Sequence, residues 1–188
     1  MQAGKRTDLE GMQALVNEGL SYAELWETNF PIMVKYHKAI AVYTDLKRGR
    51  TRLPPRIVVL FGFPGTGKTR FVFEKEPDLF NHMGGSWFDG YDGQSAALFD
   101  EFDGSDMPFC MWKKVVDRYP LRVTIKGSSA NWSPDTIYFT SNFHPKQWWA
   151  KTTKSRDYWT QFTRRITECR EYLEDGSIID CDLTQYNF

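Results

Sequence analysis

Residues 62–69 carry the side chains of a phosphate-binding loop, Gly-Phe-Pro-Gly-Thr-Gly-Lys-Thr, after an apolar run at 57–61. Backbone N–H groups of such a loop, and of the helix after it, converge on a polyphosphate. Lys68 would add a positive charge at the β and γ phosphates, and Thr69 would offer its hydroxyl to Mg²⁺. The predicted nucleotide-binding residues are Gly62, Pro64, Gly65, Thr66, Gly67, Lys68, Thr69 and Arg70. The alternative is a flexible structural turn.

A second candidate group follows the apolar run at 96–99, where Asp100 and Glu101 end a predicted strand. A hydrolase with a phosphate loop needs an acid at a neighbouring strand end to hold Mg²⁺, directly or through water. Asp100 suits that role together with Thr69, and Glu101 would polarise the attacking water as general base. The alternative is a strand that runs into an ordinary acidic turn.

A third candidate group is Asn142, which follows the apolar strand predicted at 136–140. An amide at that strand end could lie between the γ-phosphate and the attacking water, where it would sense the nucleotide and orient the nucleophile. The Ser-Asn pair alone also suits an ordinary turn.

The elements that must position these groups alternate between strand and helix from residue 56 onward, which predicts a parallel α/β sheet. The predicted strands are 57–61, 86–88, 96–102, 121–126 and 136–140. Helices are predicted after the loop, over 109–119 and over 158–165, and strands at 166–173 and 177–183 predict a terminal hairpin turning at Asp175-Gly176.

Residues 1–50 have a different, helical pattern. Thr7 with Glu10 and Ser21 with Glu24 match the capping-box spacing, and Gly19 suits the stop between the two helices. A third helix is predicted from Pro31, with apolar residues recurring along one face. The basic, proline-containing stretch that follows is typical of a linker or of a solvent-exposed run of charged residues.

Composition limits the classes of function. The chain has 24 basic and 24 acidic residues, so a nucleic-acid partner would need a local basic site. No apolar stretch approaches the roughly 20 residues of a membrane span, and no signal peptide is expected. Three cysteines without a C-x-x-C pair favour a reducing compartment, and the three scattered histidines predict no metal cluster.

The strand-end groups, taken in order, resemble those of the superfamily 3 helicases, a compact branch of the AAA+ ATPases. Trp-Phe-Asp-Gly-Tyr-Asp-Gly at 87–93 is similar to the W-W-D-G-Y-x-G stretch of circovirus-type replication initiators, the Rep proteins. The segments at 117–121, 126–127, 140–142 and 164–166 look like successive motifs of those proteins. The resemblance covers residues 56–167.

This resemblance implies further site residues. Lys126 matches the position of a hairpin that binds single-stranded DNA in the family. The residues themselves support this role in part, because Lys126 is a cation in a turn of small residues. Ser128 belongs to the same small-residue turn, and Trp132 could stack on a base. The alternative is a solvated hairpin lysine. Arg165, or less favourably Arg164, matches an arginine finger that reaches a neighbour's γ-phosphate. A plain arginine pair near helix-terminal carbonyls is the alternative.

The resemblance implies an AAA+-like P-loop ATPase core with a mainly parallel five-stranded sheet at 51–188. A helical oligomerisation segment would precede it at 1–50. The expected activity is ATP- and Mg²⁺-dependent translocation on single-stranded DNA in rolling-circle replication of a circular DNA virus. We expect the chain to act as a homo-oligomeric ring, and we expect this ring to be hexameric. Residence in the host nucleus follows from the family. The nickase of full Rep proteins needs a His-hydrophobic-His site, which this sequence lacks, so we expect the helicase part alone.

Four alternatives remain open at this point. A superfamily 3 helicase of an RNA virus would act on RNA, although the stretch at 87–93 favours DNA. A P-loop kinase for small metabolites would need an arginine-rich lid, which is not evident. A GTPase is less favoured because the N-K-x-D guanine motif is absent. A non-enzymatic assembly module would bind nucleotide only as a structural switch.

Overall fold

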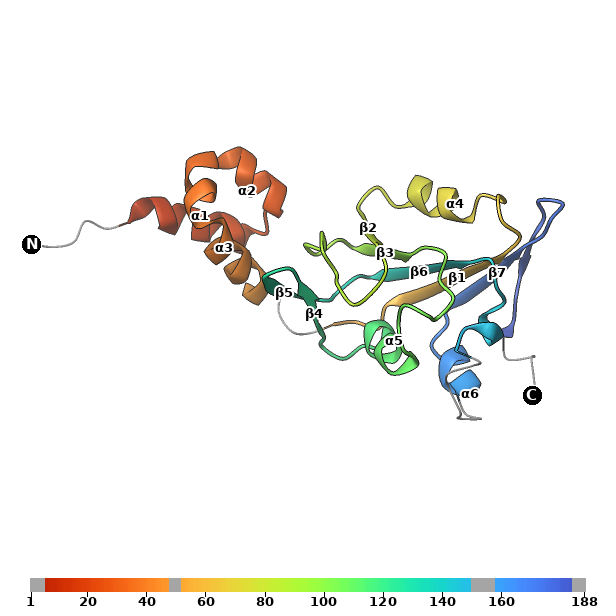
Figure 1. The fold of residues 1–188 in the computed structure, drawn as a ribbon. Helices are drawn as coiled ribbons and strands as arrows, with labels where there is room; N and C mark the ends of the chain where they lie inside the picture. Colours follow the sequence, from red (N-terminus) through yellow and green to blue (C-terminus); the bar gives the residue numbers. More distant parts are fainter. Residues whose placement is uncertain (1–5, 48–51, 150–157, 184–188) are drawn as a thin grey trace, which may run out of the picture. The chain divides into compact units, whose positions relative to one another are not determined.

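The structure, a computed structural model, describes residues 6–47, 52–149 and 158–183 of the chain (Figure 1). It separates into two compact units, Met1–Arg50 and Thr51–Phe188. Each unit has its own hydrophobic core. None of the described helices combines the length and apolar character that crossing a bilayer requires.

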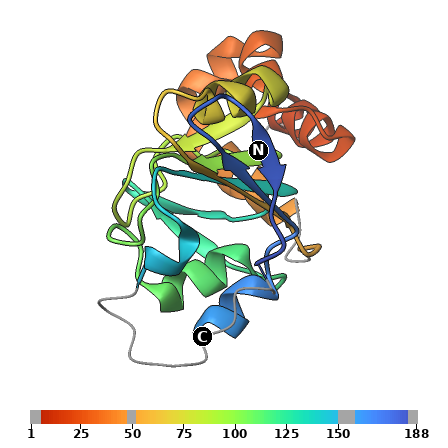
Figure 2. The same cartoon turned by 90° about the vertical axis from the view of Figure 1, so that its right-hand side faces the viewer.

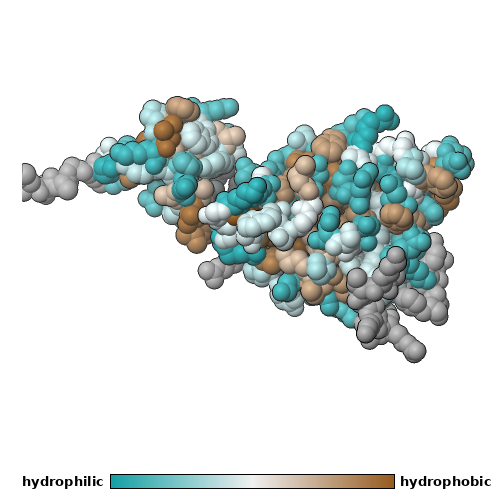
Figure 3. Space-filling view, viewed as in Figure 1, coloured by the Kyte–Doolittle hydropathy of each residue, from teal (hydrophilic) through white to brown (hydrophobic). Residues whose placement is uncertain are grey.

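The first unit consists of α1 (Thr7–Glu18), α2 (Tyr22–Thr28) and α3 (Phe30–Lys47). Its core is small and contains Met12, Val16, Leu25, Met33 and Ile40. Its surface mixes apolar and hydrophilic areas (Figure 3).

Only one of the two predicted capping boxes is present in this unit. The Ser21 side chain accepts the N–H of Glu24, and the Glu24 carboxylate accepts the N–H of Ser21, so the box before α2 is confirmed. The box at Thr7 is wrong, because Thr7 is already inside α1 and the N-cap is Arg6, which makes no side-chain cap. The predicted stop at Gly19 is confirmed, since this residue ends α1 with a left-handed φ of 91°.

The second unit is built on one six-stranded sheet with the order β2-β3-β6-β1-β7-β8. Its strands are β1 (Arg56–Gly62), β2 (Leu79–His82), β3 (Ala96–Phe99), β6 (Thr136–Ser141), β7 (Glu168–Tyr172) and β8 (Ile178–Asp180). All neighbours are parallel except β7 and β8, which form the predicted terminal hairpin. The mainly parallel α/β architecture is confirmed, with six strands in place of the predicted five.

Helices cover both faces of this sheet, which explains why its central strands are continuous apolar runs. α4 (Lys68–Lys75) lies on one face, whereas α5 (Phe109–Val116) and α6 (Tyr158–Thr163) lie on the other (Figures 1 and 2). Alternate residues of β1 accordingly belong to two different cores. A short 3₁₀ turn, η1 (Pro145–Gln147), follows β6.

Two predicted sheet strands are wrong. Residues 86–88 form no strand, and the strand beside β3 is β2, which comes earlier in the chain. The segment predicted at 121–126 does contain β4 (Arg122–Ile125), but this strand pairs antiparallel with β5 (Ser128–Asn131) in a separate hairpin. The alternating pattern alone does not distinguish a hairpin strand from a sheet strand, whereas the family resemblance correctly implied a hairpin at Lys126.

Gly62, at the end of β1, lies very close to the backbone of Tyr172 at the end of β7. We therefore predict that a larger residue at position 62 lowers stability. Its φ is +124°, and a Cβ built there would lie 2.1 Å from the carbonyl oxygen of Tyr172. Gly62→Ala should therefore destabilise the second unit by about 3 kcal/mol, measured by urea unfolding. Gly127→Ala is the matched control, because Gly127 also has a positive φ but no atom within 4 Å of its Cβ position. Equal losses in both variants would refute the steric explanation.

Candidate functional site

The sheet order brings the predicted strand-end groups to one edge. β6 lies between β1 and β3, with Phe61 opposite Ser141 and Phe99 opposite Phe139. Since all three strands are parallel, the phosphate loop, Asn142 and Asp100 leave the sheet at the same side. The acidic strand therefore does not adjoin the loop strand directly, and β6 connects them.

Lys68 is held in position by the loop itself. Its side chain is buried, with the residue 6% exposed, and its Nζ donates to the carbonyl oxygens of Gly62 at 3.0 Å and Phe63 at 2.6 Å. A third bond, of 3.1 Å, reaches Oδ1 of Asn142. Burial lowers the pKa of the Lys68 ammonium, and the negative charges of Asp100 and Glu101 oppose that shift. All three acceptors are neutral oxygens, so the ammonium charge remains available to a phosphate.

Asp100 connects the loop helix to the middle strand. Its Oδ1 accepts the hydroxyl of Thr69 at 2.7 Å and the hydroxyl of Thr140. Thr140 is 1% exposed, and its Oγ1 also accepts the backbone N–H of Glu101 at 3.0 Å. Carboxylate and hydroxyl oxygens are the ligands that Mg²⁺ prefers, so Thr69 and Asp100 form a donor set that fits this ion. The sequence predicted no role for Thr140. Its position at the end of the strand predicted at 136–140, two residues before Asn142, was a usable signal.

Glu101 has an unusual backbone conformation directly after the acidic strand. Its φ of 50° is left-handed, and it is the one non-glycine residue with positive φ among the described residues. Such a conformation costs roughly 1 kcal/mol and is found preferentially at functional sites. The bend leaves the Glu101 side chain exposed on the wall of the pocket that the strand ends surround.

An open pocket of about 270 Å³ lies between these groups. It is lined by Pro64, Gly65, Gly67, Lys68, Thr69, Arg70, Glu101, Thr140, Ser141 and Asn142. Of the predicted nucleotide-binding residues, only Gly62 and Thr66 are outside this lining. Gly62 accepts the Lys68 ammonium, and the Thr66 hydroxyl donates to the Phe63 carbonyl at 2.7 Å, which closes the loop.

The loop backbone fits a polyphosphate. Gly65 and Gly67 have φ values of 75° and 88°, and a Cβ at Gly65 would meet no atom within 4 Å. A side chain there would project into the open space in front of the loop. The residues present therefore fit a nucleotide with Mg²⁺.

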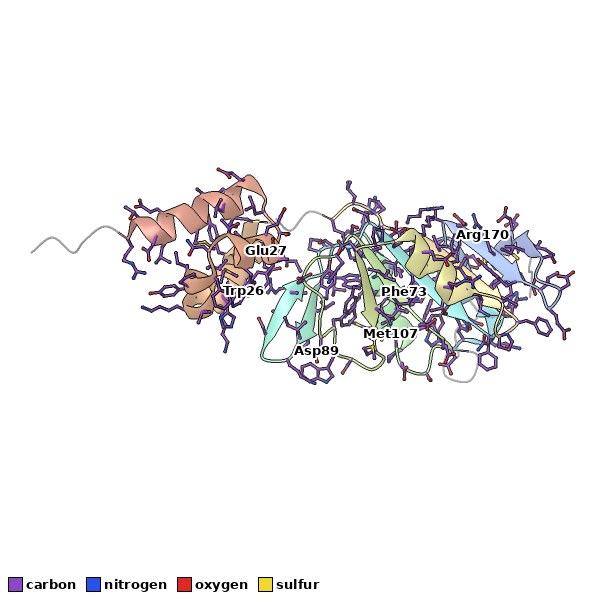
Figure 4. All side chains as sticks on the ribbon, turned by 90° about the horizontal axis from the view of Figure 1, so that it is seen from above. Trp26, Glu27, Phe73, Asp89, Met107 and Arg170 are labelled. Atoms are coloured by element: carbon purple, nitrogen blue, oxygen red, sulfur yellow. The ribbon has the colours of Figure 1, made fainter. Side chains whose placement is uncertain are left out.

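The hairpin β4–β5 carries the predicted nucleic-acid residues, with one correction. Lys126 lies at its turn, its side chain 83% exposed, and its Nζ is 3.4 Å from a carboxylate oxygen of Asp89, a residue beside the hairpin (Figure 4). Ser128, at the start of β5, is exposed. Trp132 is 1% exposed and donates its Nε1–H to the carbonyl of Val115 at 2.9 Å. The prediction that Trp132 stacks on a base is wrong, because its ring is buried in the aromatic core below the sheet.

Trp87 is an exposed aromatic residue for which the sequence predicted no contact. It is 49% exposed, and its neighbour Phe88 donates its N–H to the carbonyl of Thr124 in β4 at 2.9 Å. The loop that carries Trp87 is therefore fixed to the hairpin. Trp87 is exposed, whereas Trp132 is buried. This difference depends on tertiary packing and could not be predicted from the sequence.

The two arginines after α6 have different environments. Arg165 donates to the Gln161 carbonyl at 2.7 Å and to the Asp117 carboxylate at 3.2 Å, and its side chain is 16% exposed. Arg164 is exposed, and no side-chain partner is found for it among the described residues. Asp117 holds Arg165 inside its own chain and Arg164 is exposed, so the choice of Arg165 over Arg164 as the arginine that reaches a neighbour stays a prediction.

The sheet and its site define an α/β domain with a phosphate loop. Residues 58–143 match the RNA helicase family. The chain is 34% identical to the replication-associated protein of canary circovirus over 78% of its length, and 34% identical to that of pigeon circovirus over 79%. The replication-associated protein of human associated cyclovirus 1 is 30% identical over 87%.

The chain belongs with the superfamily 3 helicases and is related to the replication-associated proteins of circoviruses. It covers 50%, 47% and 60% of those three relatives, so it spans about half the length of the proteins it matches.

Thr140 generates a prediction about nucleotide turnover. Thr140→Val removes the hydroxyl that donates to Asp100 and accepts from Glu101, so both groups lose a partner while the side-chain shape is kept. We expect the ATPase rate to fall about 10- to 100-fold, with nucleotide affinity changed less. Thr140→Ser restores the hydroxyl and should retain most of the rate. Steady-state ATPase assays and nucleotide titrations measure both quantities, and a Val variant as active as the Ser variant would contradict the role.

Proposed function

We propose that this chain is an Mg²⁺-dependent ATPase that assembles into a ring and translocates on single-stranded DNA during viral replication. The observation that carries the proposal is the arrangement of Lys68, Asp100 and Asn142 around one pocket, linked through Thr69 and Thr140. The relationship to circoviral replication-associated proteins supports the setting in DNA replication. Residence in the host nucleus belongs to the same proposal.

The proposed hydrolysis divides its tasks among the residues of the pocket. The loop backbone from Gly65 to Thr69 binds the phosphates, and Lys68 moves its ammonium contact from the loop carbonyls to the β and γ phosphates. Glu101 accepts a proton from the attacking water, and Asn142 orients that water against the γ-phosphate. The products are ADP and inorganic phosphate.

Thr69 and Asp100 would hold Mg²⁺, which when bound neutralises charge on the β and γ phosphate oxygens. Asp100 is already oriented by two hydroxyl donors, so little rearrangement of its carboxylate is needed. Pre-oriented ligands lower the cost of binding the ion.

The proposed DNA contact combines one cation and one aromatic ring. Lys126 offers a charge to the phosphate backbone, and Trp87 replaces Trp132 as the surface on which a base stacks. Ser128 adds a hydroxyl on the same hairpin. A local site of this kind is what a chain without net positive charge requires.

The proposed ring completes each site with an arginine from a neighbour. Arg164 is the better donor, because it is exposed and Arg165 is paired with Asp117. Hydrolysis would then depend on assembly. A hexamer is the subunit number we propose.

An RNA substrate is the second candidate, because the matching family is described as an RNA helicase. The proposal for DNA rests on the circoviral relatives. Filter binding with DNA and RNA strands of equal length and sequence discriminates the two substrates. A metabolite kinase or a non-enzymatic module would show no stimulation of turnover by either strand.

The roles proposed for Lys68 and for the arginine of a neighbouring subunit lead to a prediction about mixtures of variants. Lys68→Ala should abolish ATP turnover, because Lys68 is the one buried cation among the described residues that line the pocket. Arg164→Ala should also be inactive when assembled, whereas Arg165→Ala should lose stability more than catalysis. Mixing the Lys68 and Arg164 variants should restore part of the activity, since a Lys68→Ala subunit can supply Arg164 to an intact loop. Turnover that stays absent in the mixture would argue against an arginine acting between subunits.

The hairpin generates a DNA-binding prediction. Trp87→Ala should weaken binding of single-stranded DNA by about 1–3 kcal/mol, the usual worth of a stacked base. Lys126→Ala should weaken binding and reduce the slope of log affinity against log salt by about 0.7. Fluorescence anisotropy at several salt concentrations measures both effects. Phe73→Ala is the control, because Phe73 is also 49% exposed but lies on α4. A loss for Phe73→Ala equal to that for Trp87→Ala would mean that the effect is not local.

A further inference from the structure

The segment Trp-Phe-Asp-Gly-Tyr-Asp-Gly at 87–93 is bonded to the hairpin β4–β5, and of its residues only Trp87 has a role in the proposed function. Three hydrogen bonds join the segment to the strand β4, to the turn of the hairpin and to the chain after β5. They run from the N–H of Phe88 to the carbonyl of Thr124 at 2.9 Å, from the N–H of Lys126 to Oδ1 of Asp89 at 2.6 Å, and from the N–H of Ser133 to the hydroxyl of Tyr91 at 3.0 Å. The hairpin is therefore held by this segment at its strand, its turn and its end.

Two buried rings fix the base of the segment. Phe88 and Tyr91 are 1% and 2% exposed, and both pack on Trp132, with ring centroids 5.1 Å and 4.7 Å apart. Asp89 follows Phe88 directly and lies beside the hairpin (Figure 4). Because its neighbour is buried and bonded to β4, the Asp89 carboxylate has little freedom to move away from the turn.

The turn of the hairpin is supported from outside. It consists of Lys126 and Gly127, since Ile125 pairs with Ser128. Gly127 has a φ of +77°, whereas the φ of Lys126 is not positive. These are the signs of a type II turn, and two-residue hairpins favour types I′ and II′, in which the first central residue has a positive φ. Asp89 accepts the N–H of this first residue and so stabilises a turn that the twist of a hairpin disfavours.

The second carboxylate oxygen of Asp89 faces the lysine side chain. Its Oδ2 is 3.4 Å from Nζ of Lys126, and the lysine side chain is 83% exposed against 37% for the aspartate. An exposed ion pair of this kind is weak, because water and salt screen both charges. A phosphate oxygen carries the same sign of charge as a carboxylate oxygen and accepts a bond from an ammonium in the same way. It can therefore replace Oδ2 at Lys126 while Oδ1 still holds the backbone N–H.

We propose that Asp89 is the positioning residue of the hairpin: Oδ1 holds the turn, and Oδ2 occupies the place of a DNA phosphate at Lys126 until a strand displaces it. The exchange keeps the turn fixed while the ammonium changes partner, so the strand meets a hairpin that is already ordered. In return, the strand must compete with a carboxylate of the protein. This inference rests on the DNA contact proposed for Lys126, and it adds the residue that governs that contact.

Two substitutions at position 89 of the full chain separate the two oxygens. Asp89→Asn keeps an acceptor for the N–H of Lys126 and removes the charge. It should bind fluorescently labelled oligo-deoxythymidine about two- to fivefold more tightly at low salt, the usual strength of an exposed ion pair. The gain should shrink as salt rises, because salt screens exposed charges. Asp89→Ala loses the acceptor as well and should bind less tightly than Asp89→Asn. Anisotropy titrations measure the affinities, and no gain in Asp89→Asn would overturn the competition.

A double-mutant cycle with Lys126→Ala distinguishes competition at the lysine from general repulsion of DNA by an acidic residue. Lys126→Ala removes the ammonium and keeps the backbone N–H. In that background, Asp89→Asn should gain no more affinity than Asp92→Asn gains in the unaltered chain. Asp92 is the matched control, because it is an exposed aspartate of the same segment. An undiminished gain in the absence of the lysine would overturn the proposal.

Amide hydrogen exchange of the free chain tests the role of Oδ1 without any DNA. The N–H of Lys126 should exchange about tenfold faster in Asp89→Ala than in the unaltered chain, the usual worth of a hydrogen bond to a charged group. It should stay protected in Asp89→Asn, and urea unfolding checks that both variants are folded. An exchange rate that Asp89→Ala leaves unchanged would overturn the support of the turn.

The outcomes for this inference and for the proposed function are distinct. An unaltered chain that binds no single-stranded DNA would refute the proposed function and the competition at Lys126 with it, and the exchange rates would still decide the role of Oδ1. An unaltered chain that binds DNA, with no gain from Asp89→Asn, would refute the competition and leave the proposed function intact.

Discussion

The carboxylate of Asp100 accepts two hydroxyls, and this shared acceptor ties together the elements that make the site. Thr69 belongs to the helix after the phosphate loop, and Thr140 belongs to the strand between loop and acid. If the sheet order differed, the two hydroxyls would not meet at one carboxylate. The buried Thr140 also bonds the backbone of Glu101, so Asp100 and Glu101, the proposed metal ligand and the proposed general base, are positioned by one side chain. Since Thr140 lies between them, the site depends on the middle strand as much as on the loop.

The aromatic core below the sheet explains why the β4–β5 hairpin has a fixed base. Trp132 follows β5 directly and is buried against rings from β2, β3 and the loop at 87–91. Its indole N–H also bonds the last turn of α5. A residue that anchors the hairpin cannot at the same time stack on a base. Trp132 thus anchors the hairpin, and Trp87 is the exposed tryptophan to which the proposed function assigns the contact with a base.

The two units contribute different physical properties. The second unit has an extensive core and holds its charged groups in hydrogen-bonded positions around a pocket. The first unit has a small core, and several large apolar side chains of α3 are exposed.

The sequence by itself determined the phosphate loop, the acidic strand end, the mainly parallel α/β class and the capping box at Ser21. These features depend on local chemistry, because glycine spacing, a lysine after the loop and alternating apolar runs restrict the backbone within a few residues. The tertiary structure decided the strand order, which placed Thr140 between Asp100 and Glu101. It also decided that Trp132 and Arg165 point inward and that Trp87 and Arg164 face solvent. Neighbouring residues of the same type differ only in what the folded chain packs against them, and burial of that kind is set by contacts between segments far apart in sequence.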